Sequence, residues 1–124
     1  MSLLNTSDID KAYLILRPLI TQTPLVTNEA INTLVNAKVY FKLENLQKTG
    51  SFKIRGATYK ISLLSEEQKH KGIVTYSSGN HGQAVAFASL NLGIQATIVM
   101  PDNAPKIKIE NTKSYGANVI FYNP

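Results

Sequence analysis

The 124-residue sequence contains no cysteine and no tryptophan. Without cysteine it forms neither a disulfide framework nor a thiolate metal site. It also lacks an apolar run of about 18 residues, the length that a transmembrane helix requires. Its first eight residues have neither a basic start nor a long apolar stretch, so we expect no signal peptide. We therefore expect a cytoplasmic protein without a membrane partner.

Acidic residues are scarce. The sequence has eight of them against 11 lysines and two arginines, which gives a net charge of +5. The lysines are nevertheless scattered, and no aromatic residue interleaves with Lys106, Lys108 and Lys113 as a base-stacking surface would need. We expect no nucleic-acid partner. The two histidines, His70 and His81, do not have the spacing of metal ligands, so we expect no metal site.

The chain before residue 72 predicts short, mixed elements. Apolar periodicity and alternation indicate helices at 9–16, 29–34 and 52–64, a strand at 38–43, and a further element between residues 65 and 72. Ser7 with Asp10, and Ser65 with Gln68, resemble capping boxes. We expect Ser51 to cap the helix over 52–64.

From residue 72 the pattern becomes regular. We expect strands at 73–76, 96–100 and 119–122, and helices at 83–92 and 106–115. Gly93 and Gly116 follow these helices in the usual C′ position. This order predicts an α/β protein with a parallel sheet and right-handed crossovers, and a domain boundary that separates 1–71 from 72–124. Two crossover helices cover little more than one sheet face, so we expect further chain or another subunit on the other.

Lys53 is the first candidate for chemistry, because it falls in the first turn of the helix that Ser51 is expected to cap. That helix end carries partial positive charge, which disfavours a protonated lysine there. A lysine amine without its proton attacks an aldehyde and forms a Schiff base. With 11 lysines in the chain, a lysine near a helix start is also compatible with an ordinary surface position.

Residues 77–82 (SSGNHG) are the second candidate, because they follow a predicted strand and open a predicted helix. Free backbone N–H groups at a helix N-terminus bind anions, and ligands of parallel sheets bind beyond the carboxyl ends of the strands. The anion would be a phosphate or an amino-acid carboxylate. The segment matches neither a P-loop nor a dinucleotide fingerprint. The alternative is a tight turn with capping side chains.

The two segments together resemble the fold-type II enzymes that depend on pyridoxal phosphate (PLP), in particular threonine dehydratase, serine dehydratase and serine racemase. The matching runs are 51–57 (SFKIRGA) and 77–83 (SSGNHGQ), with 23–25, 41–47, 100–101 and 115–117 in the same order. The resemblance covers residues 18–124. It implies an incomplete three-layer parallel-sheet fold, with the N-terminal part of a large domain in 1–71 and most of a small domain in 72–124.

The resemblance also implies roles for individual residues. Lys53 matches the lysine that binds PLP and shuttles the α-proton, Phe52 matches a residue beside the cofactor ring, and Asn80 matches the side chain that binds the 3′-oxygen. In the racemases the residue matching Ser78 protonates the face opposite the lysine. The loop that grips the substrate carboxylate is matched by Ser78, Gly79, Asn80 and His81.

The implied activity is deamination of L-threonine or L-serine to a 2-oxo acid, a lyase reaction of amino-acid metabolism. A serine racemase is the alternative, and a dehydratase of 3-hydroxyaspartate is the third. The alternative outside the enzymes is a non-catalytic α/β fragment or interaction module. The family's phosphate-binding glycine loop, the group facing the pyridine nitrogen and the racemases' metal ligands come later than residue 124. We therefore expect this chain to be inactive alone and the full-length protein to be a homo-oligomer.

Overall fold

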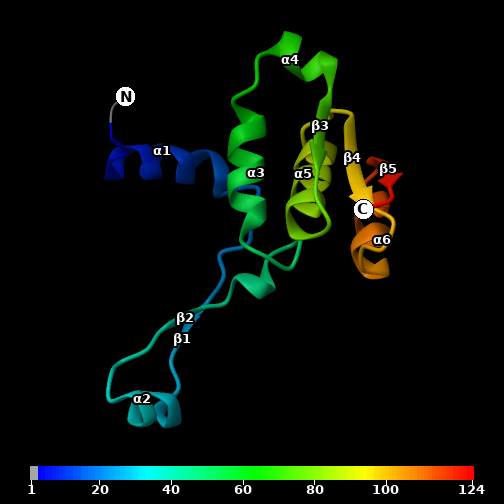
Figure 1. Ribbon diagram of the computed structural model, residues 1–124. Helices are drawn as coiled ribbons and strands as arrows, with labels where there is room; N and C mark the ends of the chain where they lie inside the picture. Colours follow the sequence, from blue (N-terminus) through cyan, green and yellow to red (C-terminus); the bar gives the residue numbers. More distant parts are fainter. Residues whose placement is uncertain (1–2) are drawn as a thin grey trace.

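The computed structural model describes residues 3–124 (Figure 1). Met1 and Ser2, which open the segment in which we expect no signal peptide, lie outside the described residues. No helix among residues 3–124 is both long and apolar enough to cross a membrane. The elements, in chain order, are α1 (Thr6–Leu16), β1 (Leu25–Val26), α2 (Glu29–Val35), β2 (Phe41–Lys42), the 3-10 helix η1 (Glu44–Leu46), α3 (Lys53–Ser62), α4 (Glu66–Lys71), β3 (Ile73–Tyr76), α5 (Asn80–Asn91), β4 (Ala96–Pro101), α6 (Lys106–Ser114) and β5 (Asn118–Tyr122).

A three-stranded parallel sheet in the order β3-β4-β5 forms the C-terminal half. Ile98 in the middle of β4 pairs with Thr75 on one side and with Val119 on the other. The side chain of Ile98 is buried. Val74 and Tyr76 point to the other face of the sheet and are 73% and 77% exposed. The prediction of an α/β fold with a parallel sheet is confirmed, and one face of this sheet is open among residues 3–124.

The core joins the two halves of the chain. Helix α3 packs against α5, and Ile54, Ala57 and Ile61 on α3 belong to the same buried cluster as Ala84 and Val85 on α5. Small alanine side chains on α5 allow the two helix axes to approach closely. Both helices begin near the middle of the molecule and run toward the side where α4 lies (Figure 1). The division of the complete fold at residue 72 stays a prediction.

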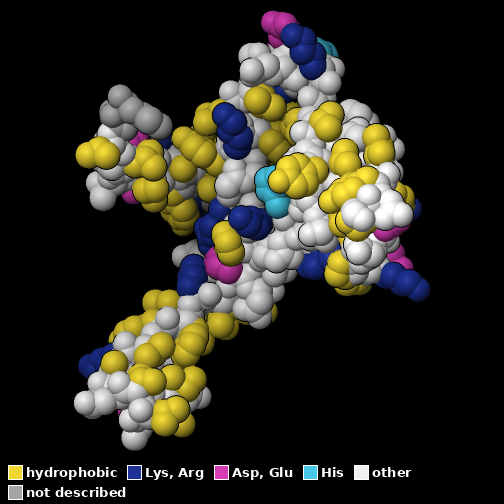
Figure 2. Space-filling model, viewed as in Figure 1, with side chains coloured by type: hydrophobic (Ala, Val, Ile, Leu, Met, Phe, Trp, Pro, Cys, Tyr) yellow, Lys and Arg dark blue, Asp and Glu magenta, His cyan; other side chains and the backbone are white. Residues whose placement is uncertain are grey.

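An arm formed by β1, α2 and β2 extends from the body of the molecule (Figure 1). Leu25 pairs with Lys42 and Val26 pairs with Phe41 in an antiparallel ladder. Because β1 offers only two residues, the strand predicted over 38–43 is shortened to 41–42. Figure 2 shows hydrophobic side chains over much of this arm. The exposed ones include Leu25, Val26, Leu34, Val35, Tyr40 and Phe41.

Helix ends agree with the sequence in part. Ser65 and Gln68 form the predicted capping box, and Gly93 and Gly116 take positive φ angles of 68° and 76° after their helices. The prediction for Ser7 is wrong, because α1 begins earlier and Asn5 forms the capping box with Asp8. Glycine at C′ was therefore a stronger signal than serine near a helix start.

Two corrections concern the segments that carry chemistry. Ser51 does not cap α3: Phe52 holds the N-cap position without a side-chain hydrogen bond, and the buried Ser51 Oγ has no partner among residues 3–124. Helix α5 begins at Asn80 instead of residue 83, with Gly79 at its N-cap. Asn80 and His81 therefore belong to the first turn of a helix and not to a loop.

Candidate active site

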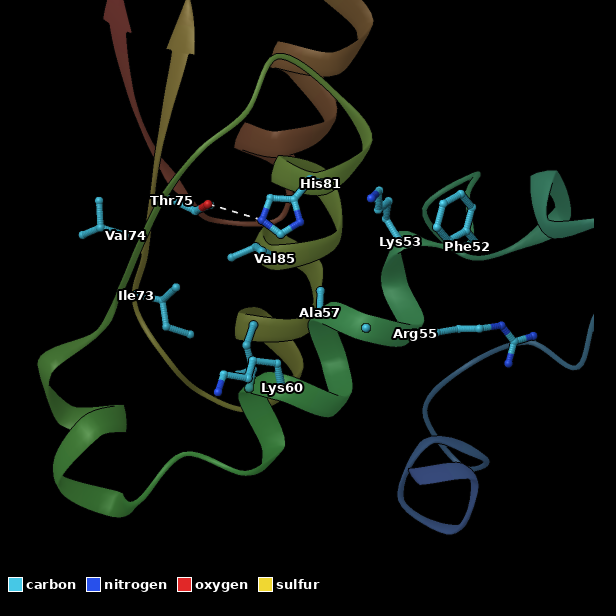
Figure 3. Close-up of a pocket in the computed structure, with 12 residues that line it drawn as sticks. Phe52, Lys53, Arg55, Ala57, Lys60, Ile73, Val74, Thr75, His81 and Val85 are labelled. Atoms are coloured by element: carbon cyan, nitrogen blue, oxygen red, sulfur yellow. Dashed lines mark hydrogen bonds between the residues drawn. The ribbon is translucent and has the colours of Figure 1, made fainter. Parts of the chain in front are cut away.

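An open depression with a volume of about 490 Å³ lies between α3, β3 and the start of α5. Figure 3 shows Lys53 and His81 near one end of it and Lys60 at the other. Its floor is apolar and includes Ala57 and Val85. The residues that border it are Phe52, Lys53, Arg55, Gly56, Ala57, Lys60, Ile61, Ile73, Val74, Thr75, His81 and Val85.

Lys53 is the first residue of α3, and its side chain is exposed. Its Nζ lies 5.1 Å from the centre of the Phe52 ring. Within the described part of the chain it forms no hydrogen bond and no ion pair. The amine is therefore accessible and not engaged by another described residue.

His81 borders the same depression from the first turn of α5. Its Nε2 lies 3.3 Å from Thr75 Oγ1 on β3, which fixes the orientation of the imidazole ring (Figure 3). The ring has hydrogen-bonding capacity beyond this contact. The side chain thus places a polar group beside the amine of Lys53.

The start of α5 has the features of an anion site. Gly79 at the N-cap has no side chain to satisfy the first amides of the helix, and its own N–H donates to Ser77 Oγ at 3.2 Å. Gly82 lets this turn approach β4, because a Cβ atom there would lie only 3.0 Å from Ile98 Cγ2. The uncapped amides and the helix dipole together favour a bound carboxylate or phosphate.

Ser78, Gly79 and Asn80 belong to this turn but are not among the residues that border the depression. Asn80 Oδ1 accepts a hydrogen bond of 2.6 Å from Lys108 Nζ, which also donates to the buried Gln83 at 2.9 Å. This contact leaves the amide nitrogen of Asn80 as the group able to donate to a ligand oxygen. The structure thus brings Phe52, Lys53 and His81 together and leaves Asn80 engaged by α6.

The sequence reasoning missed a cluster beside α3, formed by Thr23, Glu44, Gln47 and Arg55 and named here the Glu44 cluster. Arg55 donates to both carboxylate oxygens of Glu44 at 2.8 Å, and Thr23 Oγ1 donates to Oε1 at 2.5 Å. The Arg55 guanidinium, followed by the Thr23 hydroxyl, holds the pKa of Glu44 at about 2, against its ordinary 4.5. Residues 41–47 were recognised as a family signature, yet nothing in their spacing indicated that Arg55 is the partner.

Comparison with known proteins identifies the family. The family described as pyridoxal-phosphate dependent enzyme matches residues 16–124. The chain therefore belongs to this family of PLP-dependent enzymes. An L-threonine dehydratase of Staphylococcus aureus is 48% identical over 120 residues, which are 96% of this chain and 35% of the relative. An L-threo-3-hydroxyaspartate ammonia-lyase of Saccharomyces cerevisiae is 46% identical over 104 residues, 84% of this chain and 32% of the relative.

A solved structure, that of maize serine racemase, superimposes with a TM-score of 0.93 at 43% identity and covers 99% of this chain. This match confirms the predicted fold of the fold-type II PLP enzymes. The chain spans 37% of the racemase chain and about a third of the curated relatives. The relatives carry the names of a dehydratase, an ammonia-lyase and a racemase, so the family includes several reactions on amino acids.

The residues present fit the aldehyde end of PLP. The cofactor needs a primary amine that is accessible and not engaged by a carboxylate, and Lys53 meets both conditions in the described part of the chain. Phe52 provides an aromatic ring beside that amine. The depression is open enough for a planar aromatic ring to enter from solvent.

Proposed function

We propose that this chain carries the catalytic lysine of a PLP-dependent threonine or serine dehydratase, which converts the amino acid into ammonia and a 2-oxo acid. The observation that carries the proposal is the exposed, unengaged amine of Lys53 at the start of α3, in a chain of a PLP-dependent family. The 48% identity to a threonine dehydratase supports this reaction.

In this proposal the chain's own residues have separate tasks. PLP, when bound, draws electrons away from the α-carbon of the amino acid. Lys53 Nζ would hold the cofactor at rest and, once the substrate amine has displaced it, would accept the α-proton as a free amine. The backbone N–H groups at the start of α5, from Gly79 to His81, would bind the substrate carboxylate. The side-chain amide nitrogen of Asn80 would donate to the cofactor's 3′-oxygen. Phe52 would lie beside the cofactor ring.

The test is covalent labelling of the 124-residue chain with PLP, followed by borohydride reduction and peptide mapping. We expect the label on Lys53 and its loss in Lys53→Ala. Lys60→Ala is the matched control, because Lys60 borders the same depression from the other end of α3. Equal labelling of Lys53→Ala and wild type would refute the assignment of Lys53. A wild-type chain that takes up no label would favour a non-catalytic interaction module.

Serine racemase is the second candidate function, supported by the maize structure and by the exposed position of Ser78. A racemase needs a second acid–base group on the face opposite the lysine, and the Ser78 hydroxyl would supply it. In a full-length protein that contains this sequence, Ser78→Ala should reduce racemisation at least about tenfold and spare dehydration. Equal loss of both activities would remove this role from Ser78.

The yeast relative supports 3-hydroxyaspartate as a third possible substrate, which would bring a second carboxylate into the site. The cytoplasmic location and the homo-oligomeric state of the full-length protein stay predictions.

A further inference from the structure

The first turn of α3 carries Lys53, yet no side chain caps it. Phe52 at the N-cap has no polar group, and Ser51 turns its hydroxyl into the interior. A helix end without a cap frays easily, because its first amides have no fixed partner. A precise position for Lys53 therefore has to come from another contact.

Arg55, two residues after Lys53, makes that contact. Its side chain extends away from β3 and from the imidazole of His81 (Figure 3). Nε and one terminal nitrogen each donate to Glu44 at 2.8 Å. Such a two-pronged contact between planar groups fixes orientation as well as distance. The Glu44 side chain is only 17% exposed and that of Arg55 is 31% exposed, so solvent competes weakly for either group.

Glu44 is itself held on its other sides. Thr23 donates its hydroxyl to Oε1, and the amide nitrogen of Gln47 lies 3.4 and 3.5 Å from the two carboxylate oxygens. Gln47 in turn forms two hydrogen bonds with the backbone of Thr21, one in each direction, at 3.1 and 2.8 Å. Both Thr23 and Gln47 are buried. The cluster thus ties two segments, residues 21–23 and residues 44–47, to the first turn of α3.

We propose that the Glu44 cluster positions Lys53. Through its two hydrogen bonds with the Arg55 guanidinium, Glu44 holds the first turn of α3, so that the lysine amine stays beside His81 and the start of α5. This inference rests on the proposed role of Lys53. Glu44 and Arg55 are positioning residues, because they act through the helix and do not touch the reacting atoms. A purely stabilising cluster would leave the reactivity of Lys53 unchanged in every folded variant.

The test compares rates of Lys53 labelling by PLP in Glu44→Gln, Arg55→Lys and wild type, under conditions in which urea unfolding shows each protein to be fully folded. Arg55→Lys keeps the positive charge but cannot form the paired hydrogen bonds of the guanidinium. It therefore separates positioning by those hydrogen bonds from the electrostatic attraction to Glu44. Small misplacements of a reacting group cost up to about a hundredfold in rate, and we expect both variants to label at least about tenfold more slowly. Glu66→Gln is the matched control, because it breaks the exposed Glu66–Lys69 pair and should label like wild type.

A second readout separates failure of this inference from failure of the proposed function. Amide hydrogen exchange over residues 51–57 should become at least about tenfold faster in Glu44→Gln, with no change over β4. If wild type labels at Lys53 and both variants label at the same rate, the positioning role is overturned while the function stands. If wild type does not label at all, the proposed function fails, and unchanged exchange over 51–57 would then overturn the positioning role as well.

Discussion

Two lysines on α3 border the same depression but occupy opposite electrostatic positions. Lys53 is the first residue of the helix and Lys60 lies in its last turn. The helix dipole disfavours an ammonium group at the first position and favours it at the last. Of these two lysines, Lys53 is the one whose amine lies near an aromatic ring, that of Phe52.

At the residue scale, Glu44 should give the stability of the protein a distinct dependence on pH. Its pKa falls from 4.5 to about 2 in the folded chain, mainly because Arg55 donates to it. A carboxylate whose pKa is lowered by folding stabilises the protein above its unfolded value and loses that effect as the pH falls through its folded value. The difference corresponds to at most about 3.5 kcal/mol, and the partial exposure of the pair reduces it.

We therefore expect Glu44→Gln to have a lower free energy of unfolding than wild type at pH 7. This difference in free energy should become smaller as the pH falls from 4.5 to about 2. Urea unfolding at a series of pH values measures it. Among the described residues, the charged group that acts on Glu44 in this range is Arg55. A gap that is constant over this range would show that the carboxylate is not held as its contacts indicate.

A side chain at Gly82 should destabilise the protein. A Cβ atom there would lie 3.0 Å from Ile98 Cγ2 and 3.3 Å from Ser77 Cβ, and Ile98 is fully buried. Overpacking of this kind costs about 1–3 kcal/mol, so Gly82→Ala should lower the free energy of unfolding by that amount. Gly56→Ala is the control, because nothing lies within 4 Å of its added methyl group. That change should be neutral or stabilising by about 0.5–1 kcal/mol.

At the scale of elements, local signals predicted the C-terminal half well. The strands at β3, β4 and β5 and the ends of α5 and α6 follow from β-branched runs and from glycines that adopt positive φ, which are properties of a few adjacent residues. Lys53 at the first turn of its helix was also predicted correctly. These features need no knowledge of distant parts of the chain.

The remaining features depend on contacts between distant residues. Ser51 looks like a cap, but its side chain is drawn into the interior by the turn at Gly50, where φ is 71°. The start of α5 moved by three residues because Gly79 serves as the N-cap in place of a serine or asparagine. The Glu44 cluster joins positions 23, 44, 47 and 55, and no single-sequence pattern links residues that are so far apart. The sequence therefore indicated Lys53 as a candidate and its place at the start of a helix, but not the contacts that hold that helix turn.

At the scale of the whole molecule, one face of the β3-β4-β5 sheet carries exposed apolar side chains, including Val74, Tyr76 and Ile120. Parallel sheets are normally covered on both faces. Relatives that contain this region are about three times as long, since it makes up 35% of the dehydratase. The open face and the protruding arm are where the rest of such a fold would pack.

The packing of α3 on α5 has a consequence for how the chain is made. Ile54, Ala57 and Ile61 find their partners on a helix that ends at Asn91, so they leave the ribosome well before that helix is complete. At synthesis rates of about 5–20 residues per second, the apolar side of α3 stays uncovered for a few seconds. During that interval the apolar side of α3 faces solvent, and the helix that carries Lys53 gains its packing partner only after α5 has been synthesised.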